Sequence, residues 1–317
     1  MLIKSIKISL NPLHFSKGCA VPNRIFFLLL LITIGLWGSA QPGSAQALIP
    51  HTLRLDSTKL EQQGLGLAQE SSQLAQFQQY ELALQRAKLA TQLAPKSPEV
   101  WSLLGGLYLQ TNDLDQGIAS LKKSQSLNGS GKNSAVLFAL GSAYFQKGNY
   151  LTAVDYLKEG LKVKPKVPGA LFDLGNAYLM LKRFPEAIAQ YEQAVAQDKN
   201  FWPAINNIGL IKYEVGNGEE ALKQWQKAAD LDPKAAEPRL AIAAALYAKG
   251  KRDQGLSLGD SAMRLDSRYA DIKFLKENLW GERLLTDTRK LLETPQIRAT
   301  LAQIQEKNPR TQRPSPR

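Results

Sequence analysis

The chain has very few of the side chains on which most catalytic and metal-binding sites depend. Of its 317 residues, one is cysteine and two are histidines. Cys19 and His14 lie near the N-terminus, so only His51, with no carboxylate beside it, remains beyond residue 50. A catalytic triad needs a histidine held by a carboxylate, and zinc sites need several histidine or thiolate ligands. Beyond residue 50 the sequence therefore excludes disulfides, cysteine nucleophiles, histidine-based triads and two-histidine metal sites.

A complete phosphate-binding loop is also missing. The run GSGKNS at residues 129–134 superficially resembles one, but Ser126 stands where its first glycine belongs. Asn133 stands where serine or threonine would bind magnesium. Neighbouring carboxylates such as Glu219 and Glu220 begin a predicted helix, where they favour the helix dipole. We therefore predict that the chain is not an enzyme, with no catalytic residue, no bound metal and no cofactor.

Acidic residues are absent from the first 47 positions, and basic residues gather at both ends of the chain. The formal net charge is +12, a value that could favour nucleic acid as a partner. Much of this charge belongs to the two termini, at Lys4, Lys7, Lys17, Arg24, Lys307, Arg310, Arg313 and Arg317. The middle of the chain is only mildly basic. We therefore expect no nucleic-acid binding, and residues 307–317 are predicted to be a disordered basic tail.

The first 47 residues have the order of a secretory signal peptide. A basic start precedes the apolar run 25–37, and small residues lead to Ala45, Gln46 and Ala47. The run has 13 residues, fewer than the roughly 20 that span a bilayer as a helix. We predict cleavage after Ala47 and export, to the periplasm or the thylakoid lumen. The alternative is an uncleaved leader that anchors the protein in the membrane.

Residues 168–201 predict a pair of amphipathic helices. Leu171, Leu174 and Tyr178 recur at steps of three and four residues, with Gly175 on the same face. After a short turn the same spacing returns at Ala187, Tyr191 and Ala194. A hairpin of two such helices is too small to bury its own apolar faces, so it needs stacked copies.

The sequence supplies those copies in register. The dyads Leu104-Gly105, Leu140-Gly141, Leu174-Gly175 and Ile208-Gly209 recur at intervals of 36, 34 and 34 residues. The predicted second helices align small residues at Gly117, Ala153, Ala187 and Ala221, and bulky ones at Leu121, Leu157, Tyr191 and Trp225. This pattern resembles the tetratricopeptide repeat, and Trp101 supplies the family's opening tryptophan. The resemblance implies an all-α, right-handed superhelical solenoid of stacked antiparallel helix pairs, with about six repeats.

The register also predicts the boundaries. Residues 48–63 are a linker and the start of the first helix, and repeats follow at 64–97, 98–133, 134–167, 168–201, 202–235 and 236–269. The first repeat is degenerate, because Glu70 and Ser71 replace Leu and Gly. Residues 270–306 continue an apolar stripe and are predicted to be capping helices, with docking of a partner near Trp280 as the alternative. The segment 275–285 resembles tails of cyanobacterial repeat proteins.

The family resemblance implies a concave groove lined by the first helix of each repeat. Its positions correspond here to Phe138, Ser142, Phe145, Phe172, Asn176, Leu179, Met180, Asn206 and Tyr213. Because this set is apolar with a few amides, we expect an apolar or helical protein or peptide segment as ligand. Phe172 and Glu237 occupy positions where a clamp for a terminal carboxylate needs lysine, so that clamp is not expected. The alternative is that the aromatic residues only pack against adjacent helices.

These features together predict a non-enzymatic protein-binding scaffold outside the cytoplasm. Its expected role is the assembly or maintenance of a membrane-associated complex, and membrane association would come through the leader or through the partner. The alternative function is a structural subunit of an envelope or secretion machine that docks through its C-terminal helices.

Overall fold

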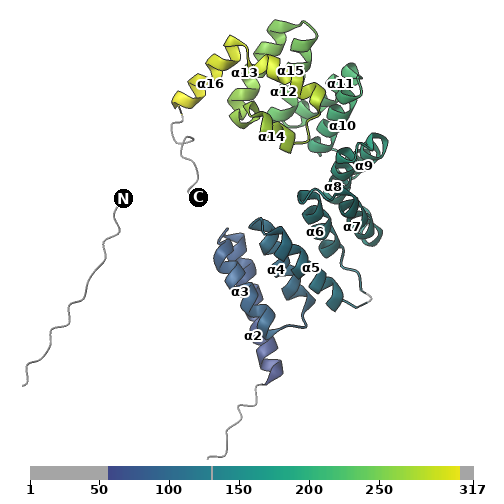
Figure 1. The fold of residues 1–317 in the computed structure, drawn as a ribbon, viewed down its shortest axis with the longest axis vertical. Helices are drawn as coiled ribbons and strands as arrows, with labels where there is room; N and C mark the ends of the chain where they lie inside the picture. The colour runs from purple at the N-terminus through teal and green to yellow at the C-terminus, as the bar shows by residue number, and fades with distance from the viewer. Residues whose placement is uncertain (1–55, 130, 308–317) are drawn as a thin grey trace, which may run out of the picture. The chain divides into compact units, whose positions relative to one another are not determined.

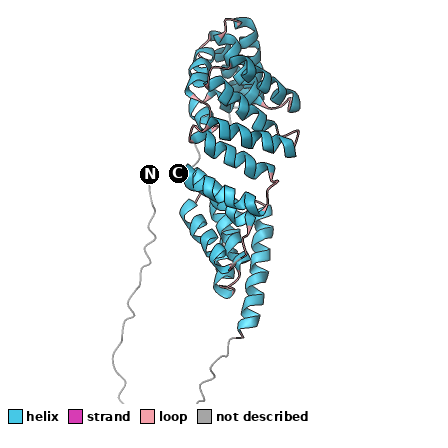
Figure 2. Ribbon diagram, turned by 90° about the vertical axis from the view of Figure 1, so that its right-hand side faces the viewer, coloured by secondary structure: helices cyan, strands magenta, loops and turns pink. Residues whose placement is uncertain are grey.

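The computed structural model describes residues 56–129 and 131–307, and this part of the chain is helical, with no strand (Figure 2). None of its helices is both long enough and apolar enough to cross a membrane. The predicted leader with its cleavage site at Ala47 lies outside the described residues. The same holds for residues 308–317 of the predicted tail.

Six antiparallel helix pairs follow one another along the chain (Figure 1). They are α2 (Ser57–Gln76) with α3 (Tyr80–Leu93), α4 (Pro98–Gln110) with α5 (Leu114–Leu127), α6 (Ser134–Gln146) with α7 (Tyr150–Val163), α8 (Pro168–Met180) with α9 (Phe184–Gln197), α10 (Trp202–Glu214) with α11 (Gly218–Leu231), and α12 (Ala236–Ala248) with α13 (Arg252–Leu265). Each second helix also packs against the first helix of the next pair. The predicted all-α superhelical repeat fold is thereby confirmed.

Local sequence signals begin the helices and end them. The side chains of Asp56, Ser97 and Asp113 accept hydrogen bonds from backbone N–H groups in the first turns of α2, α4 and α5. Proline occupies the first turn of α4, α8, α9 and α10, where its missing donor costs little. The turn within each pair has one residue with positive φ, at Gln78, Asn112, Gly148, Lys182, Gly216 and Gly250. These residues repeat the 34- and 36-residue register.

Small residues allow the two helices of each central pair to approach closely. A Cβ atom added to Gly175 would lie 2.5 Å from the ring of Tyr191, and one added to Gly209 would lie 2.4 Å from Trp225 Nε1. In the degenerate first pair, Ser71 occupies the glycine position. Its hydroxyl donates a hydrogen bond of 2.7 Å to the carbonyl of Ala83. Close packing explains why small and bulky residues alternate in register.

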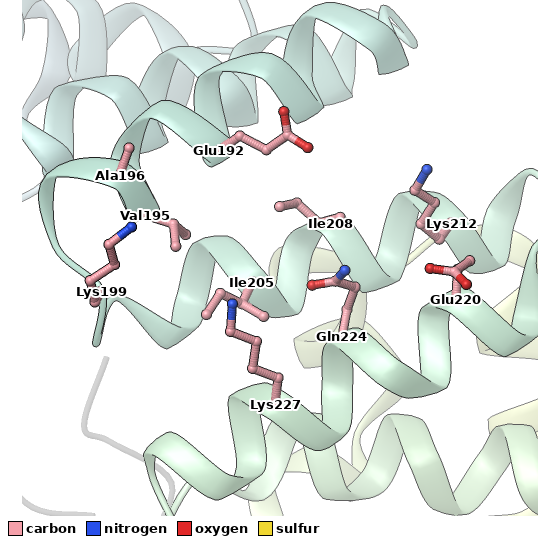
Figure 3. A pocket seen from close by; sticks show the side chains of 10 residues that line it. All are labelled: Glu192, Val195, Ala196, Lys199, Ile205, Ile208, Lys212, Glu220, Gln224 and Lys227. Carbon is pink, nitrogen blue, oxygen red and sulfur yellow. The ribbon is translucent and has the colours of Figure 1, made fainter.

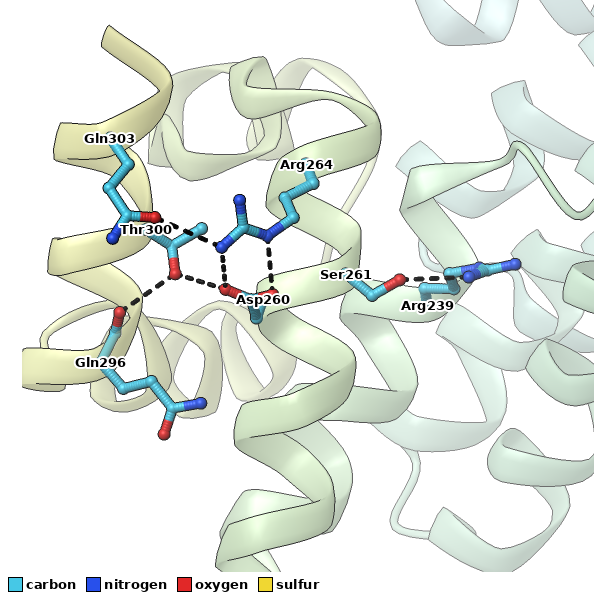
Figure 4. Close-up of polar contacts among 7 residues, drawn as sticks. All are labelled: Arg239, Asp260, Ser261, Arg264, Gln296, Thr300 and Gln303. Carbon is cyan, nitrogen blue, oxygen red and sulfur yellow. Dashed lines mark hydrogen bonds and ion pairs between the residues drawn. The ribbon is translucent and has the colours of Figure 1, made fainter. Parts of the chain in front are cut away.

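The chain continues beyond the sixth pair with η2 (Ser267–Ala270), α14 (Ile272–Glu277), α15 (Glu282–Leu292) and α16 (Pro295–Lys307). Helix α16 packs against α13, where Thr300 donates a hydrogen bond to Asp260 and Arg264 pairs with the same carboxylate (Figure 4). Helix α15 takes another course and packs against α12 and α10. The last pair is therefore covered by two separate C-terminal helices.

Candidate functional site

The residues predicted to line the groove lie on α6, α8 and α10, in four different environments. Phe138 and Phe172 pack within the repeats. A Cβ atom at Gly160 of α7 would lie 2.4 Å from the Phe138 ring. The Phe172 ring centroid lies 5.6 Å from that of Tyr191 and 5.4 Å from that of Phe201. Both phenylalanines are half-buried. Their contacts agree with the alternative that these aromatic residues pack against adjacent helices.

The predicted amides belong to a network of polar side chains. Asn176 Oδ1 accepts hydrogen bonds from Tyr191 Oη at 2.7 Å and from Asn207 Nδ2 at 3.0 Å. Asn206 Nδ2 donates to Asn207 Oδ1 at 3.2 Å, and only 1% of Asn206 is exposed. Burial also raises the pKa of the Tyr191 hydroxyl, which stays protonated as a donor. These amides position neighbouring repeats against each other.

Ser142 extends the polar contacts to the previous pair. Its hydroxyl donates a hydrogen bond of 2.9 Å to Asp173 Oδ2 on α8. Burial raises the pKa of the Asp173 carboxyl, while the hydrogen bond from Ser142 acts in the opposite direction. This contact joins α6 to α8, so Ser142 is committed to the packing of the array.

The remaining open residues are Phe145, Leu179 and Met180. Phe145 and Leu179 are half-buried, and Met180 is 37% exposed. Leu179 and Met180 line a cavity of about 370 Å³, together with Phe184, Leu210, Leu279 and Trp280. Three charged side chains, Lys182, Glu214 and Glu282, also line it. We call this space the inner cavity, and an apolar pocket with a few charged side chains is a typical binding site.

Residues 279–292, here called the covering segment, lie over the equivalent positions of α10 and α12. Tyr213 Oη donates a hydrogen bond of 2.8 Å to Asp287 Oδ2, and the backbone N–H of Arg283 donates to Glu214 Oε2 at 3.2 Å. Tyr213 is consequently buried, with 6% of its surface exposed. The chain itself therefore occupies the predicted groove at its C-terminal end.

Trp280 anchors the covering segment. Its indole Nε1 donates a hydrogen bond of 2.9 Å to Glu237 Oε1, and 4% of the residue is exposed. The expected alternative of a partner docking on Trp280 is therefore wrong for this structure, because the side chain is part of the core. Burial raises the pKa of the Glu237 carboxyl, while hydrogen bonds from Trp280, Asn206 and Tyr269 act in the opposite direction.

Comparison with known families identifies the repeats. Tetratricopeptide repeat models match residues 98–130, 138–200 and 209–250. These three segments are similar to tetratricopeptide repeats. No curated protein matches the sequence. The array is similar to solved tetratricopeptide repeat structures at identities that show the fold alone.

Three solved structures illustrate this likeness. A crystal structure of MamA protein has a TM-score of 0.50 and 23% identity, over 56% of this chain and 94% of that one. YrrB, described as a TPR protein with an unusual peptide-binding site, has a TM-score of 0.50 and 20% identity, over 62% of this chain and 98% of that one. A chain of the APC/C hetero-tetramer Cut9-Hcn1 has a TM-score of 0.56 and 16% identity, over 75% of this chain and 46% of that one.

The sequence predicts capping helices at residues 270–306, but it did not indicate that residues 279–292 cover the inner face of α10 or that Trp280 is the partner of Glu237. The tetratricopeptide repeat pattern placed Glu237 where a carboxylate clamp needs lysine. It did not indicate which side chain would donate a hydrogen bond to this buried carboxyl. Trp280 supplies that group from 43 residues away. A buried acid at a groove position and an indole donor beyond the repeats are the signals that together could have indicated the contact. Among residues 56–129 and 131–307, no cluster of His, Cys, Asp or Glu is suited to holding a metal ion.

Proposed function

We propose that this tetratricopeptide repeat chain is a non-catalytic scaffold that binds a protein or peptide segment at the inner cavity. The observation that carries the proposal is the apolar wall of this cavity. Met180 is exposed there beside Leu179 and Phe184, with Phe145 one repeat earlier. Apolar side chains that remain accessible around a concave space favour association with another apolar surface.

The covering segment supports a helical ligand. Helix α15 is amphipathic, with Leu284, Leu285 and Leu291 buried against the array and charged residues on its other side. It contacts Tyr213, which is equivalent to Leu179 in the preceding repeat. Because equivalent repeat positions have similar backbone geometry, a partner helix with an apolar face fits the open positions of α6 and α8.

Location and process rest on the leader. Its basic start, apolar run and small residues before Leu48 favour export, and hence a role in assembling or maintaining a membrane-associated complex. Sequencing the N-terminus of the purified protein tests this, with Leu48 as the expected first residue. An intact leader in a carbonate-resistant membrane fraction would indicate an anchor instead.

The alternative role is a subunit of an envelope or secretion machine that docks through its C-terminal helices. Trp280, the residue expected to make that contact, is buried and does not offer a docking surface.

Photo-crosslinking in cells tests the binding site. We would place benzoylphenylalanine at Met180 and, as a control, at Leu151, which is 63% exposed on α7 outside the inner cavity. The expected result is a protein adduct at Met180 that is absent at Leu151 and lost when Leu179→Asp is added. Identical adducts at both positions, or an adduct unaffected by Leu179→Asp, would show that the inner cavity is not the binding site.

A further inference from the structure

A second kind of cavity lies between successive second helices, with the intervening first helix as its floor. The largest of these spaces, about 400 Å³, lies between α9 and α11 over α10 (Figure 3). An equivalent cavity of about 310 Å³ lies between α7 and α9 over α8. Their lining residues correspond one repeat apart: Leu171 with Ile205, Leu174 with Ile208, and Gln190 with Gln224. We call the two spaces second-helix cavities.

At the same place in other repeats, the chain fills the space with its own side chains. Trp101, equivalent to Ile205, donates from its indole to the carbonyl of Pro95 at 2.9 Å. Arg239, the equivalent in the last repeat, donates to the carbonyl of Pro233 at 2.6 Å and to Ser261 Oγ at 3.2 Å (Figure 4). The second-helix cavities are open because Leu171 and Ile205 are too short to make such contacts.

The groove between α5 and α7 is filled in a third way. Tyr144 and Tyr156 stack there with ring centroids 5.5 Å apart, and the ammonium of Lys122 lies 5.5 Å from the Tyr144 ring. Gln190 and Gln224 replace Tyr156 in the next two repeats. The chain's own side chains thus occupy three grooves of the array in three different ways, although a cavity of about 200 Å³ remains beside Leu137. The two second-helix cavities are larger and contain no such side chain from the described residues.

The cavity between α9 and α11 combines an apolar floor with ammonium groups. Val195 is half-buried and contributes apolar surface above the buried Ile205 and Ile208. Lys199, Lys212 and Lys227 reach the cavity from the α9–α10 turn, from α10 and from α11 (Figure 3). Within the described part of the chain, none of the three lysines forms an ion pair. Such a site is complementary to an anionic group carried next to an apolar one.

Two carboxylates also line this cavity. Glu220 is already engaged, because its Oε1 lies 2.8 Å from the ammonium of Lys223. Glu192 lies on the opposite side of the cavity and would repel a continuous phosphate backbone. The mixture of carboxylates, lysines and apolar floor therefore favours a peptide over a nucleic acid.

We propose that the second-helix cavity between α9 and α11 binds an acidic peptide segment. One apolar side chain of the segment packs against Val195, above the buried Ile205 and Ile208, and its carboxylates bind Lys199, Lys212 and Lys227. The cavity between α7 and α9, with Lys158 and Lys162 in its wall, continues the same chemistry along the array. This site shares no lining residue with the inner cavity, so its ligand is a second one.

The test is fluorescence anisotropy of the full chain with a fluorescein-labelled octapeptide of alternating glutamate and leucine. The variant K199Q/K212Q/K227Q should weaken binding by at least about tenfold, because three exposed ion pairs are removed together. A matched control, K59Q/K96Q/K251Q, removes the same charge at exposed positions outside the cavity. It should bind as the wild type does.

A steric variant separates the site from general charge. Ala196 is exposed at the edge of the cavity, so Ala196→Trp should block it without changing charge and with little effect on the denaturation midpoint. Leu179→Asp, in the inner cavity, should leave peptide binding unchanged. The proposal is overturned if the wild type does not bind the peptide, or if both lysine variants lose binding equally. A single-stranded oligothymidylate that binds as tightly, and loses binding in the same cavity variant, would overturn it in favour of a phosphate ligand.

Discussion

The inner faces of α8 and α10 are built from equivalent repeat positions but end in opposite states. In α8, Leu179 and Met180 line an open cavity. In α10, Tyr213 is the equivalent of Leu179, and the covering segment buries it. The repeat pattern fixes which side chains face inward. Whether that face becomes core or binding surface depends on a segment that lies outside the repeats.

The part of the array from α10 onward, here called the covered half, is stabilised by the covering segment. Trp280, Leu284, Leu285 and Leu291 are each at most 4% exposed and join one apolar cluster with α10, α12 and α13. Fully burying a leucine side chain contributes roughly 1.5 to 3 kcal/mol. The helix pairs before α10, here called the open half, lack this contribution but keep an accessible apolar surface, which is what a binding scaffold requires.

Of the predicted changes, Trp280→Ala should have the largest effect on the difference in stability between the two halves. Removing this buried indole should cost roughly 3 to 5 kcal/mol, and Glu237 Oε1 loses the hydrogen bond that the indole donates. Chemical denaturation would measure the loss, and hydrogen exchange should rise across the covering segment and α10. Phe145→Ala in the open half is the control, and because Phe145 is half-buried we expect a smaller loss, roughly 1 to 2 kcal/mol. Equal losses would remove the distinction between the halves.

The next prediction concerns a feature that the two halves share. Gly175→Leu and Gly209→Leu should each destabilise the fold by roughly 1 to 3 kcal/mol or more, because a Cβ at either position clashes with the second helix. The covering segment should make no difference to this cost. Gly106→Ala is the control, since a Cβ there meets no atom within 4 Å. An unchanged denaturation midpoint for Gly175→Leu would contradict the helix packing.

The pH dependence of stability reports on the covered half through Glu237. Its raised pKa means that the folded chain holds a proton which the unfolded chain releases. Stability from this group is fully present below the ordinary pKa of glutamate and is lost as pH rises towards the raised value. Glu237→Gln should not show this loss, and each unit of pKa difference is worth about 1.4 kcal/mol. A wild type that gains stability relative to Glu237→Gln as pH rises would contradict the burial.

The smallest effect is expected at the turn before α9. Lys182 has φ of 58°, a conformation that costs a residue with a side chain more than it costs glycine. Lys182→Gly should therefore raise stability by roughly 0.5 to 1 kcal/mol, measured as an upward shift of the denaturation midpoint. Gly148→Lys, at the equivalent turn of the preceding pair, should lower it by a similar amount.

Much of the fold could be predicted from the sequence, because the close contact between Gly175 and Tyr191 demands a fixed register that recurs at each repeat. Capping helices after the last repeat could also be predicted, but the surface that the covering segment covers could not. Helical periodicity shows that the residues around Trp280 have an apolar face, but not which surface that face covers. The groove positions came from the family resemblance. They did not reveal that Phe172 packs on Tyr191 and Phe201, since partners in packing are not part of a repeat motif.

Cysteine accessibility at two equivalent positions tests the difference between the halves most directly. With Cys19→Ser as background, Leu179→Cys and Tyr213→Cys place single thiols 34 residues apart on the inner faces of α8 and α10, the first at a half-buried position in the inner cavity and the second under the covering segment. We predict that a maleimide labels the thiol at 179 at least about tenfold faster, and that adding Trp280→Ala removes most of this difference. Equal labelling rates in the folded protein, or protection of position 213 that persists after Trp280→Ala, would contradict the proposed arrangement.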